Sequence, residues 1–437
     1  MNDEFDFSDL IETVNEFGRS VESNRRYDEM KSTFENLGLE VSSGWVLTKY
    51  KGRGGRVEIP EEVQAIAENA FQSSPLLTEV VVHGDLSSVG NGAFGACRVL
   101  QSFEFKGTVA KLGTGVFSGC EMLEKIVLPS NIKAIPNSTF SGCKKLNQVF
   151  RYNEVESIGW HAFYNCAKLP AASFGRVKVI DDGAFWGCSA LSAFDAGSCL
   201  EHLGESSFKN CFSLRNMQLP KTVKTIGKCC FENAGLERVA VPSDVIKIEA
   251  GTFAGCVNLR SAMFTDNLLE IGASAFAGCV NLFEAHISEY VVRIHAAAFN
   301  DCKSLSISSR NKKYKYAANC VLEVVDNNLI VISSLQESVI VNGFAEIGKY
   351  AFSNRKIKFT RLVVPPSVKK IGEKAFANST IKELIIYSDN IMFEKGAFDS
   401  MPMGLCIQCK PKIKSMLTGN SMQLGLSTGC TFKEITE

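Results

Sequence analysis

Long apolar runs and net charge are both missing from this sequence of 437 residues. No stretch of about 18 consecutive apolar residues occurs, so no membrane-spanning helix is expected. The 47 basic and 47 acidic residues cancel to a formal net charge of zero at pH 7. A chain without a net positive field does not attract nucleic acid or an anionic membrane over a long range, so neither partner is expected.

A secretory signal is also missing from the first 20 residues, which read MNDEFDFSDLIETVNEFGRS. A signal peptide begins with basic residues and continues with an apolar stretch. This segment instead carries the carboxylates of Asp3, Glu4, Asp6, Asp9, Glu12 and Glu16. On these grounds a cytoplasmic location is expected.

One short phrase recurs along most of the chain. The stretch Ile271 to Leu282 reads IGASAFAGCVNL, and its Phe returns every 22 to 24 residues, with one longer gap of 53 residues before Phe352. The phenylalanines of the phrase are Phe71, Phe94, Phe117, Phe140, Phe163, Phe185, Phe208, Phe231, Phe253, Phe276, Phe299, Phe352, Phe376 and Phe398. A period of 20 to 50 residues is typical of a solenoid, so the sequence predicts stacked repeats and not two or three ordinary domains.

Each repeat predicts two short extended segments joined by a turn. The first is exemplified by LEKIVLP, a strand that directs Leu123, Ile126 and Leu128 inward and Lys125 outward by strand alternation. The second is exemplified by VKTIG, which ends at Gly227, a glycine free to take a positive φ. The Ala-Phe pair begins the turn, and the Phe fills the space between the two segments. Stacked repeats then share one continuous core.

Cysteine, in contrast, is abundant, with 16 residues. Nine of them stand three residues after the repeat Phe: Cys97, Cys120, Cys143, Cys166, Cys188, Cys211, Cys256, Cys279 and Cys302. Stacking brings their Cα atoms to about 5 Å, within reach of a disulfide. Parallel strands would however aim the side chains the same way, so a file of buried thiols in a reducing compartment is predicted.

The repeat resembles the BspA-type (treponemal) leucine-rich repeat, whose signature is I-G-x-x-A-F-x-x-C. The resemblance covers about residues 41 to 437, and GWVLTKYKGRGGRVEIPEEVQAIAENAF (Gly44 to Phe71) is similar to a first repeat of the family. The resemblance implies a leucine-rich-repeat horseshoe with parallel β-strands on its concave face. It also implies a binding role such as adhesion or host-protein contact, and a secreted or surface-attached location.

The ends and one insertion depart from the repeat. Residues 1–40 are interpreted as an amphipathic helical segment, either a cap or an interaction element, with a possible break near Asn24. Residues 41–410 hold about 14 repeats, and a hairpin insertion at about 306–343 includes NCVLEVVDNNLIVIS (Asn319 to Ser333). The basic stretch RNKKYKY (Arg310 to Tyr316) predicts a solvated loop, or a contact for an acidic partner. Residues 411–437, with a helix and a final strand, resemble the C-terminal cap of the family.

No catalytic, cofactor or metal site is predicted. The five histidines fall at different repeat positions, so they do not compose a triad or a metal site: His83, His161, His202, His286 and His295. Cys406 and Cys409 form CIQC, but a zinc site needs a second pair and a redox motif needs a following helix in a βαβ unit. The glycines of KGRGGR precede a strand, so they make no phosphate-binding loop. The chain is therefore expected not to be an enzyme.

Outward positions of the strands predict the binding surface. Eight and ten residues after the repeat Phe, with a one-residue slip at one repeat, stand mixed, neutral and moderately apolar residues that suit a protein or peptide. The expected contacts are Lys125, Phe150, Arg238, Met263 and His286, with Phe150 and Met263 as apolar anchors. The same series places Ser261 outward.

Three functions are considered. The first is a non-catalytic protein-binding scaffold that uses the concave strands or the N-terminal helix. The second, which the family resemblance implies, is a cell-surface or host-directed adhesin. The third is carbohydrate binding, which requires exposed aromatic residues in register, for which Phe150, Trp160 and Trp186 are the candidates.

Overall fold

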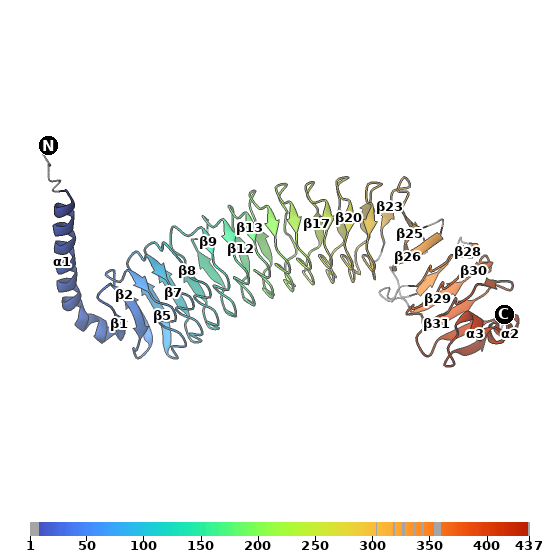
Figure 1. Ribbon diagram of the computed structural model, residues 1–437, viewed down its shortest axis with the longest axis horizontal. Coiled ribbons are helices and arrows are strands. Elements are labelled where there is room, and N and C mark those ends of the chain that lie inside the picture. The colour runs from blue at the N-terminus through green and yellow to red at the C-terminus, as the bar shows by residue number, and fades with distance from the viewer. Residues whose placement is uncertain are drawn as a thin grey trace, which may run out of the picture. The chain divides into compact units, whose positions relative to one another are not determined.

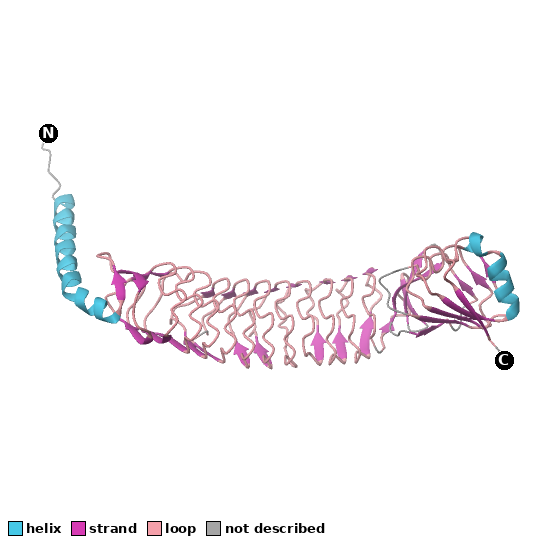
Figure 2. Cartoon of the chain, turned by 90° about the horizontal axis from the view of Figure 1, so that it is seen from below, coloured by secondary structure: helices cyan, strands magenta, loops and turns pink. Residues whose placement is uncertain are grey.

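The computed structural model describes residues 8–151, 153–302, 304–317, 320–325, 328–334, 338–341, 345–353 and 360–435, with the side chains of the first helix described from Glu22 onward. The chain divides into two compact units, Met1–Leu169 (unit 1) and Pro170–Glu437 (unit 2). In both units the repeats are turns of a parallel β-solenoid, about 16 turns in all. Figures 1 and 2 show stacked strands joined by loops, with few helices. The predicted repeat solenoid is confirmed.

Unit 1 begins with a helix and continues with two series of strands. Helix α1 (Ser8–Leu37) leads into the antiparallel pair β1 (Leu39–Val41) and β2 (Val46–Tyr50). Longer parallel strands form one sheet: β3 (Gly55–Ile59), β5 (Leu77–Val82), β7 (Ser102–Phe105), β8 (Lys125–Val127) and β10 (Gln148–Phe150). Two-residue strands form the other wall: β4 (Ala65–Ile66), β6 (Ser88–Val89), β9 (Ala134–Ile135) and β11 (Ser157–Ile158). We call the outward sides of these walls the long-strand face and the short-strand face.

Unit 2 repeats the same two walls. Its long-strand wall contains β12 (Ala171–Ser173), β14 (Ala193–Asp195), β17 (Arg238–Ala240), β19 (Ser261–Met263), β21 (Glu284–Ile287), β23 (Ser306–Ile307), β27 (Ser338–Ile340), β29 (Arg361–Val364), β31 (Glu383–Ile386), β33 (Cys406–Cys409) and β34 (Thr431–Glu434). Its short strands are β13 (Val179–Ile180), β15 (His202–Leu203), β16 (Thr225–Ile226), β18 (Lys247–Ile248), β20 (Glu270–Ile271), β22 (Arg293–Ile294), β28 (Glu346–Ile347), β30 (Lys370–Ile371) and β32 (Met392–Phe393). Helices α2 (Pro411–Gly419) and α3 (Ser421–Leu424) precede β34.

The repeat phenylalanines form a stacked core in each unit. All fourteen are buried. In unit 1 the rings of Phe117 and Phe140 lie 5.6 Å apart and nearly parallel, at 3°. In unit 2 Phe276 and Phe299 lie 5.3 Å apart at 1°. In these stretches each ring packs on the ring of a neighbouring turn, so the repeats bury their Phe side chains together.

The repeat cysteines are buried thiols, as predicted. All nine are free and buried. Each thiol for which the contact is described donates to the carbonyl of the Phe one turn earlier: Cys97, Cys120, Cys143, Cys166, Cys211, Cys256, Cys279 and Cys302, at 3.0 to 3.2 Å. The thiols thus link neighbouring turns by hydrogen bonds, a role that the repeat pattern alone did not predict.

The structure does not support a positive φ as the reason for the glycine that follows the short strand. Gly227 is not among the residues with positive φ. A Cβ added to it would lie 2.5 Å from the Glu205 nitrogen and 2.5 Å from the Gly204 carbonyl carbon. Glycine stands there because the backbone of the preceding turn lies too close for a side chain. Left-handed backbone occurs instead two residues before the Phe, as at Ser138 (φ 55) and His161 (φ 52).

At the N-terminus, α1 is a single helix that continues through Asn24, so the expected break does not occur. Its second half packs on the first turn. Phe34 is buried, and its ring lies 6.4 Å from the Trp45 ring. Tyr27 Oη donates to the Val41 carbonyl at 2.7 Å, and Trp45 Nε1 donates to Ser23 Oγ at 2.9 Å.

The insertion contains an antiparallel sheet of β24 (Tyr314–Ala317), β25 (Cys320–Val325) and β26 (Asn328–Ser334). The β25–β26 pair lies where the sequence predicts a hairpin, whose central Asp326 and Asn327 are outside the described residues. The basic stretch before it is not wholly a solvated loop, because Tyr314 is 1% exposed and belongs to β24. Its Oη accepts the Ile294 N–H at 2.8 Å, so this stretch is anchored to the last turn before the insertion.

Candidate binding surfaces

In unit 1 the structure brings Lys125 and Phe150 together. They lie on neighbouring long strands, where Lys125 is the partner of Gln148 and Phe150 the partner of Val127. Phe150 is 44% exposed, and the Lys125 ammonium lies 5.7 Å from the centre of its ring. A cation at this distance is attracted by the ring. The pair is a partly exposed apolar surface with a positive charge beside it.

In unit 2 the structure places Arg238, Met263 and His286 on three consecutive long strands. Arg238 pairs with Ser261, which pairs with Glu284. Met263 is 58% exposed, and His286 Nδ1 lies 2.9 Å from Ser306 Oγ. Ser261, whose strand partners Arg238 and Glu284 are exposed, is itself only 4% exposed. A small residue in the centre of this wall is covered, while its larger neighbours stay exposed.

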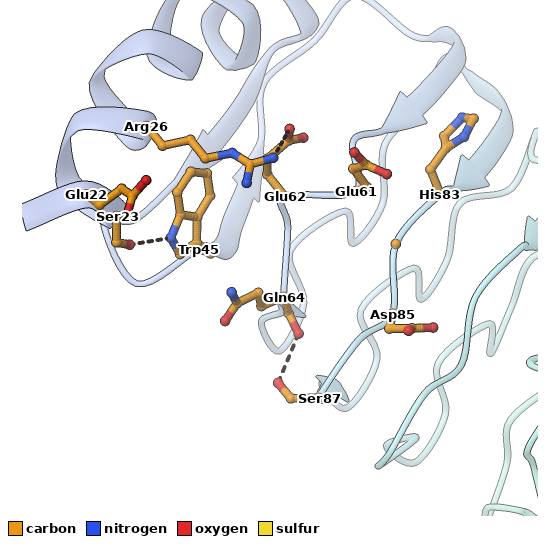
Figure 3. A pocket seen from close by; sticks show the side chains of 11 residues that line it. Glu22, Ser23, Arg26, Trp45, Glu61, Glu62, Gln64, His83, Asp85 and Ser87 are labelled. Carbon is orange, nitrogen blue, oxygen red and sulfur yellow. Dashed lines mark hydrogen bonds and ion pairs between the residues drawn. The ribbon is translucent and has the colours of Figure 1, made fainter. Parts of the chain in front are cut away.

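Residues that are distant in the sequence also form a pocket in unit 1 that sequence reasoning missed (Figure 3). Its volume is about 870 Å³, and it lies between α1 and the loops that precede β4 and β6. The lining residues are Glu22, Ser23, Arg26, Trp45, Glu61, Glu62, Gln64, His83, Gly84, Asp85 and Ser87. No local motif signals this pocket, because it exists only once α1 packs on the first turns.

The pocket is acidic. Its lining holds four carboxylates and one guanidinium, which leaves three net negative charges with histidine neutral. Arg26 pairs with Glu62 at 3.1 Å. The backbone N–H and the hydroxyl of Thr108 donate to Asp85 Oδ1 at 2.7 and 2.9 Å, and these bonds hold the pKa of Asp85 below its usual value. Asp85 therefore stays ionised in mildly acidic solution.

His83, at the rim of the pocket, joins a charge cluster on the long-strand face. Its Nε2 lies 3.1 Å from Glu58 Oε2. Arg56 donates to the other oxygen of Glu58 at 2.8 Å, and the bonds from Arg56 and His83 lower the pKa of Glu58. Arg56 also reaches Glu79 on β5 at 2.9 Å. The charged side chains of this cluster are therefore paired with one another.

The candidate residues for chemistry and for sugar stacking are spread out. Cys406 and Cys409 lie on one strand, where the first is partly exposed and the second buried. Trp160 is 47% exposed and stacks on His161, with ring centres 3.8 Å apart, while Lys209 lies 5.1 Å from the ring of Trp186. Within the described residues, no group of three His, Cys, Asp or Glu side chains is placed to hold a metal ion. No described helix combines the length and apolar character that a membrane crossing requires.

A family model described as "BspA type Leucine rich repeat region (6 copies)" matches this chain at residues 64–192, 178–306 and 323–418. These segments cover more than half of the chain, and the protein belongs to this family. Its members are generally not enzymes and are typically secreted or located at the cell surface. The expected cytoplasmic location is therefore not supported.

Solved structures of bacterial leucine-rich repeat proteins resemble the chain at low identity. A protein from Bacteroides ovatus is 19% identical, with a TM-score of 0.42, over 90% of this chain and 94% of that one. A leucine rich cell surface protein from Faecalibacterium prausnitzii is 17% identical, with a TM-score of 0.32, over 90% and 92%. The T. pallidum leucine rich repeat protein is 22% identical, with a TM-score of 0.25, over 57% and 88%. Among curated proteins, no sequence matches this chain.

Proposed function

We propose that this protein is a non-catalytic binding protein whose long-strand face contacts a protein or a peptide. One observation carries the proposal: in each unit a large apolar side chain stands exposed on this face, Phe150 at 44% and Met263 at 58%. Because the strand backbone is already ordered by the sheet, a partner that covers these side chains does not have to order the backbone as well. They are therefore suited to act as anchors.

The polar residues around the anchors support a protein partner. Lys125 lies over the Phe150 ring, and Arg238 and His286 lie on the strands on either side of Met263. Polar and charged groups around an apolar centre are typical of protein interfaces. Both units present this combination, so a peptide or a folded partner could use either.

The proposal is tested by affinity capture from an extract with the wild-type chain and with the double variant Phe150→Ala, Met263→Ala. We expect the double variant to lose about tenfold or more of the specifically captured partner, because two anchors are removed. The matched control is Phe212→Ala, Met403→Ala, which removes side chains 58% and 87% exposed that lie outside the strands. Equal capture by the two double variants would contradict the role of the long-strand face.

A second candidate element is α1, because three residues that line the acidic pocket, Glu22, Ser23 and Arg26, come from this helix. Deleting residues 1–21 keeps the contacts of Ser23, Tyr27 and Phe34 with the first turn. If this deletion abolishes capture while the Phe150→Ala, Met263→Ala variant captures normally, α1 is the binding element and the long-strand face is not.

We further propose that the protein acts at the cell surface as an adhesin, a role supported by the typical location of its family. The test is fractionation of the native cells followed by surface proteolysis with a protease that cannot enter them. Degradation of the protein on intact cells is the expected result. Complete protection, with all of the protein in the cytosolic fraction, would contradict a surface role.

A further inference from the structure

Three consecutive turns of unit 2 expose an apolar side chain at the position just before the short strands β18, β20 and β22. Ile246, Leu269 and Val292 are 56%, 41% and 56% exposed. The Leu269 N–H donates to the Ile246 carbonyl and the Val292 N–H to the Leu269 carbonyl, both at 2.9 Å, so the three lie side by side. We call these residues the apolar row. Other turns carry charged residues at this position, as at Lys133, Glu156, Lys178, Glu201 and Lys224.

The apolar row ends at a groove. This groove has a volume of about 350 Å³, and Val292 and Tyr290 form one side of it. The other side is the loop of residues 310–313. Tyr290 is 52% exposed, so it continues the apolar surface of the row into the groove. We call this feature the basic groove, because of the loop residues described below.

Asn311 holds the loop in place. The side chain is 4% exposed, and its Nδ2 donates to the carbonyls of Ser288 and Val291 at 3.0 and 3.2 Å. Its Oδ1 accepts the N–H groups of Lys313 and Tyr314 at 3.0 and 2.9 Å. These four bonds use both donors and both acceptor sites of the amide. The basic side chains of the loop are therefore presented on a fixed backbone.

The charge of the groove favours an acidic occupant. Its lining contains three cations and the single carboxylate of Glu289. Arg310 reaches Glu289 at 3.5 Å but is 81% exposed, and Lys313 reaches Glu323 at 3.5 Å. Such exposed pairs are weak. Lys312 is exposed and has no ion-pair partner among the described residues.

We propose that the apolar row and the basic groove bind the N-terminal helix of a second copy of this chain. Residues 1–18 contain six carboxylates and no Lys or Arg, which complements the basic groove. Over residues 10–21, apolar residues recur every three or four positions, at Leu10, Val14, Phe17 and Val21. A helix advances about 5.4 Å per turn and stacked strands about 4.8 Å. Successive helical turns therefore fall on successive members of the row.

The proposed contact uses the first half of α1. The contacts described between α1 and the first turn come from Ser23, Arg26, Tyr27 and Phe34 in its second half, and the side chains before Glu22 lie outside the described residues. Figure 1 shows the first half of α1 extending away from β1 and β2. Because the helix and the groove are different surfaces, the contact is heterologous, and each bound copy offers a further groove.

The first test is sedimentation velocity of the full chain over a range of protein and salt concentrations. The expected result is reversible association that weakens with salt, because the acidic helix and the basic groove attract each other. Val292→Asp is expected to weaken association about tenfold or more. The matched control Val257→Asp changes a valine that is 50% exposed but outside the row, and should associate like the wild type. The proposal is overturned if the wild-type chain is monomeric at every concentration. It is also overturned if Val292→Asp and Val257→Asp weaken association equally.

The second test is a charge exchange that identifies the occupant. Arg310→Glu with Lys312→Glu should abolish association, and adding Asp3→Lys with Asp6→Lys to the same chain should restore it, because Asp3 and Asp6 share the helical spacing of Leu10, Val14 and Phe17. Loss without restoration overturns the N-terminal helix as the occupant. A synthetic peptide of residues 3–24 should compete with wild-type association. Failure of this peptide to bind the full chain likewise assigns the row to another partner and overturns the proposal.

Discussion

At the scale of the residue, the same hydrogen bonds recur from turn to turn. Asp85 Oδ1 accepts the N–H and the hydroxyl of Thr108, and Asn91 Oδ1 accepts the same two groups of Thr114 at 2.9 and 3.2 Å. A carboxylate oxygen and an amide oxygen thus accept the same pair of hydrogen bonds from a threonine in the next turn. They differ in charge, so only the Asp85 bonds depend on pH.

This difference predicts a pH effect for Asp85→Asn. The folded-state pKa of Asp85 lies below its ordinary value of 3.8, so its contribution to stability is present above that value and is lost as the pH falls through the folded pKa. We expect the variant to lose less stability than the wild type between about pH 5 and pH 2. Urea unfolding of both proteins across this range measures the difference. Identical pH dependence would show that the Thr108 bonds do not stabilise the ionised form.

The buried thiols give a second prediction at this scale. Burial raises the pKa of Cys230 to about 12, and burial raises the pKa of Cys211 well above its ordinary value. Since the thiolate is the reactive form, the buried cysteines with raised pKa values should resist iodoacetamide in the folded protein and react after unfolding. The partly exposed Cys199 and Cys406 should react first. Mass spectrometry of the labelled sites checks the order, and early labelling of the buried cysteines would contradict the described core.

At the scale of the element, the positions of the strands could be predicted from the sequence better than the roles of individual residues in them. The spacing of the Phe residues located both walls, and alternation correctly placed Ile126 inward and Lys125 outward. The role of Gly227 was misjudged because a close approach between turns is a property of stacking, which one repeat does not reveal. The buried Tyr314 was missed for a related reason, since its partner Ile294 lies 20 residues away.

Gly227→Ala tests the close approach. The added methyl would lie 2.5 Å from backbone atoms of the preceding turn, so the turns must separate. We expect a loss of about 1–3 kcal/mol in the free energy of unfolding, measured by denaturant titration. Gly175→Ala is the matched control, because a Cβ there meets nothing within 4 Å. An equal cost at both sites would show that contact with the preceding turn is not the cause of the loss.

Phe34→Ala tests the packing of α1. The ring is 2% exposed and packs near Trp45 and Tyr27, so its loss should cost about 3–5 kcal/mol. Because these contacts hold the helix, hydrogen exchange should accelerate in α1 and β1 while the later turns of unit 1 keep their protection. Unchanged exchange in α1 would mean that Phe34 does not hold the helix in place.

At the scale of the whole molecule, each turn contacts mainly its neighbours, so stability should be close to a sum of local terms. Phe276→Ala removes a ring stacked between Phe253 and Phe299. We expect faster hydrogen exchange in these three turns and a broader unfolding transition, with little change in unit 1. A uniform acceleration throughout the chain would contradict local coupling.

The candidate sites differ in how far the sequence could reveal them. The five outward residues on the long strands followed from the repeat phase, because alternation fixes which side chains point outward. The acidic pocket and the loop held by Asn311 did not, because both depend on contacts between segments that carry no shared motif. The repeat pattern therefore predicts surfaces that recur in every turn. Sites formed where the chain departs from the repeat can be located only from the structure.

The most direct test of the central claim is photo-crosslinking at the anchors of the long-strand face. A photoreactive amino acid replaces Phe150 or Met263 in the full chain, and Phe212 or Met403 in matched controls. On irradiation with intact cells or their extracts, we expect a crosslinked protein partner at positions 150 and 263 and none at the control positions. Crosslinks at the controls alone would show that the partner contacts a different surface.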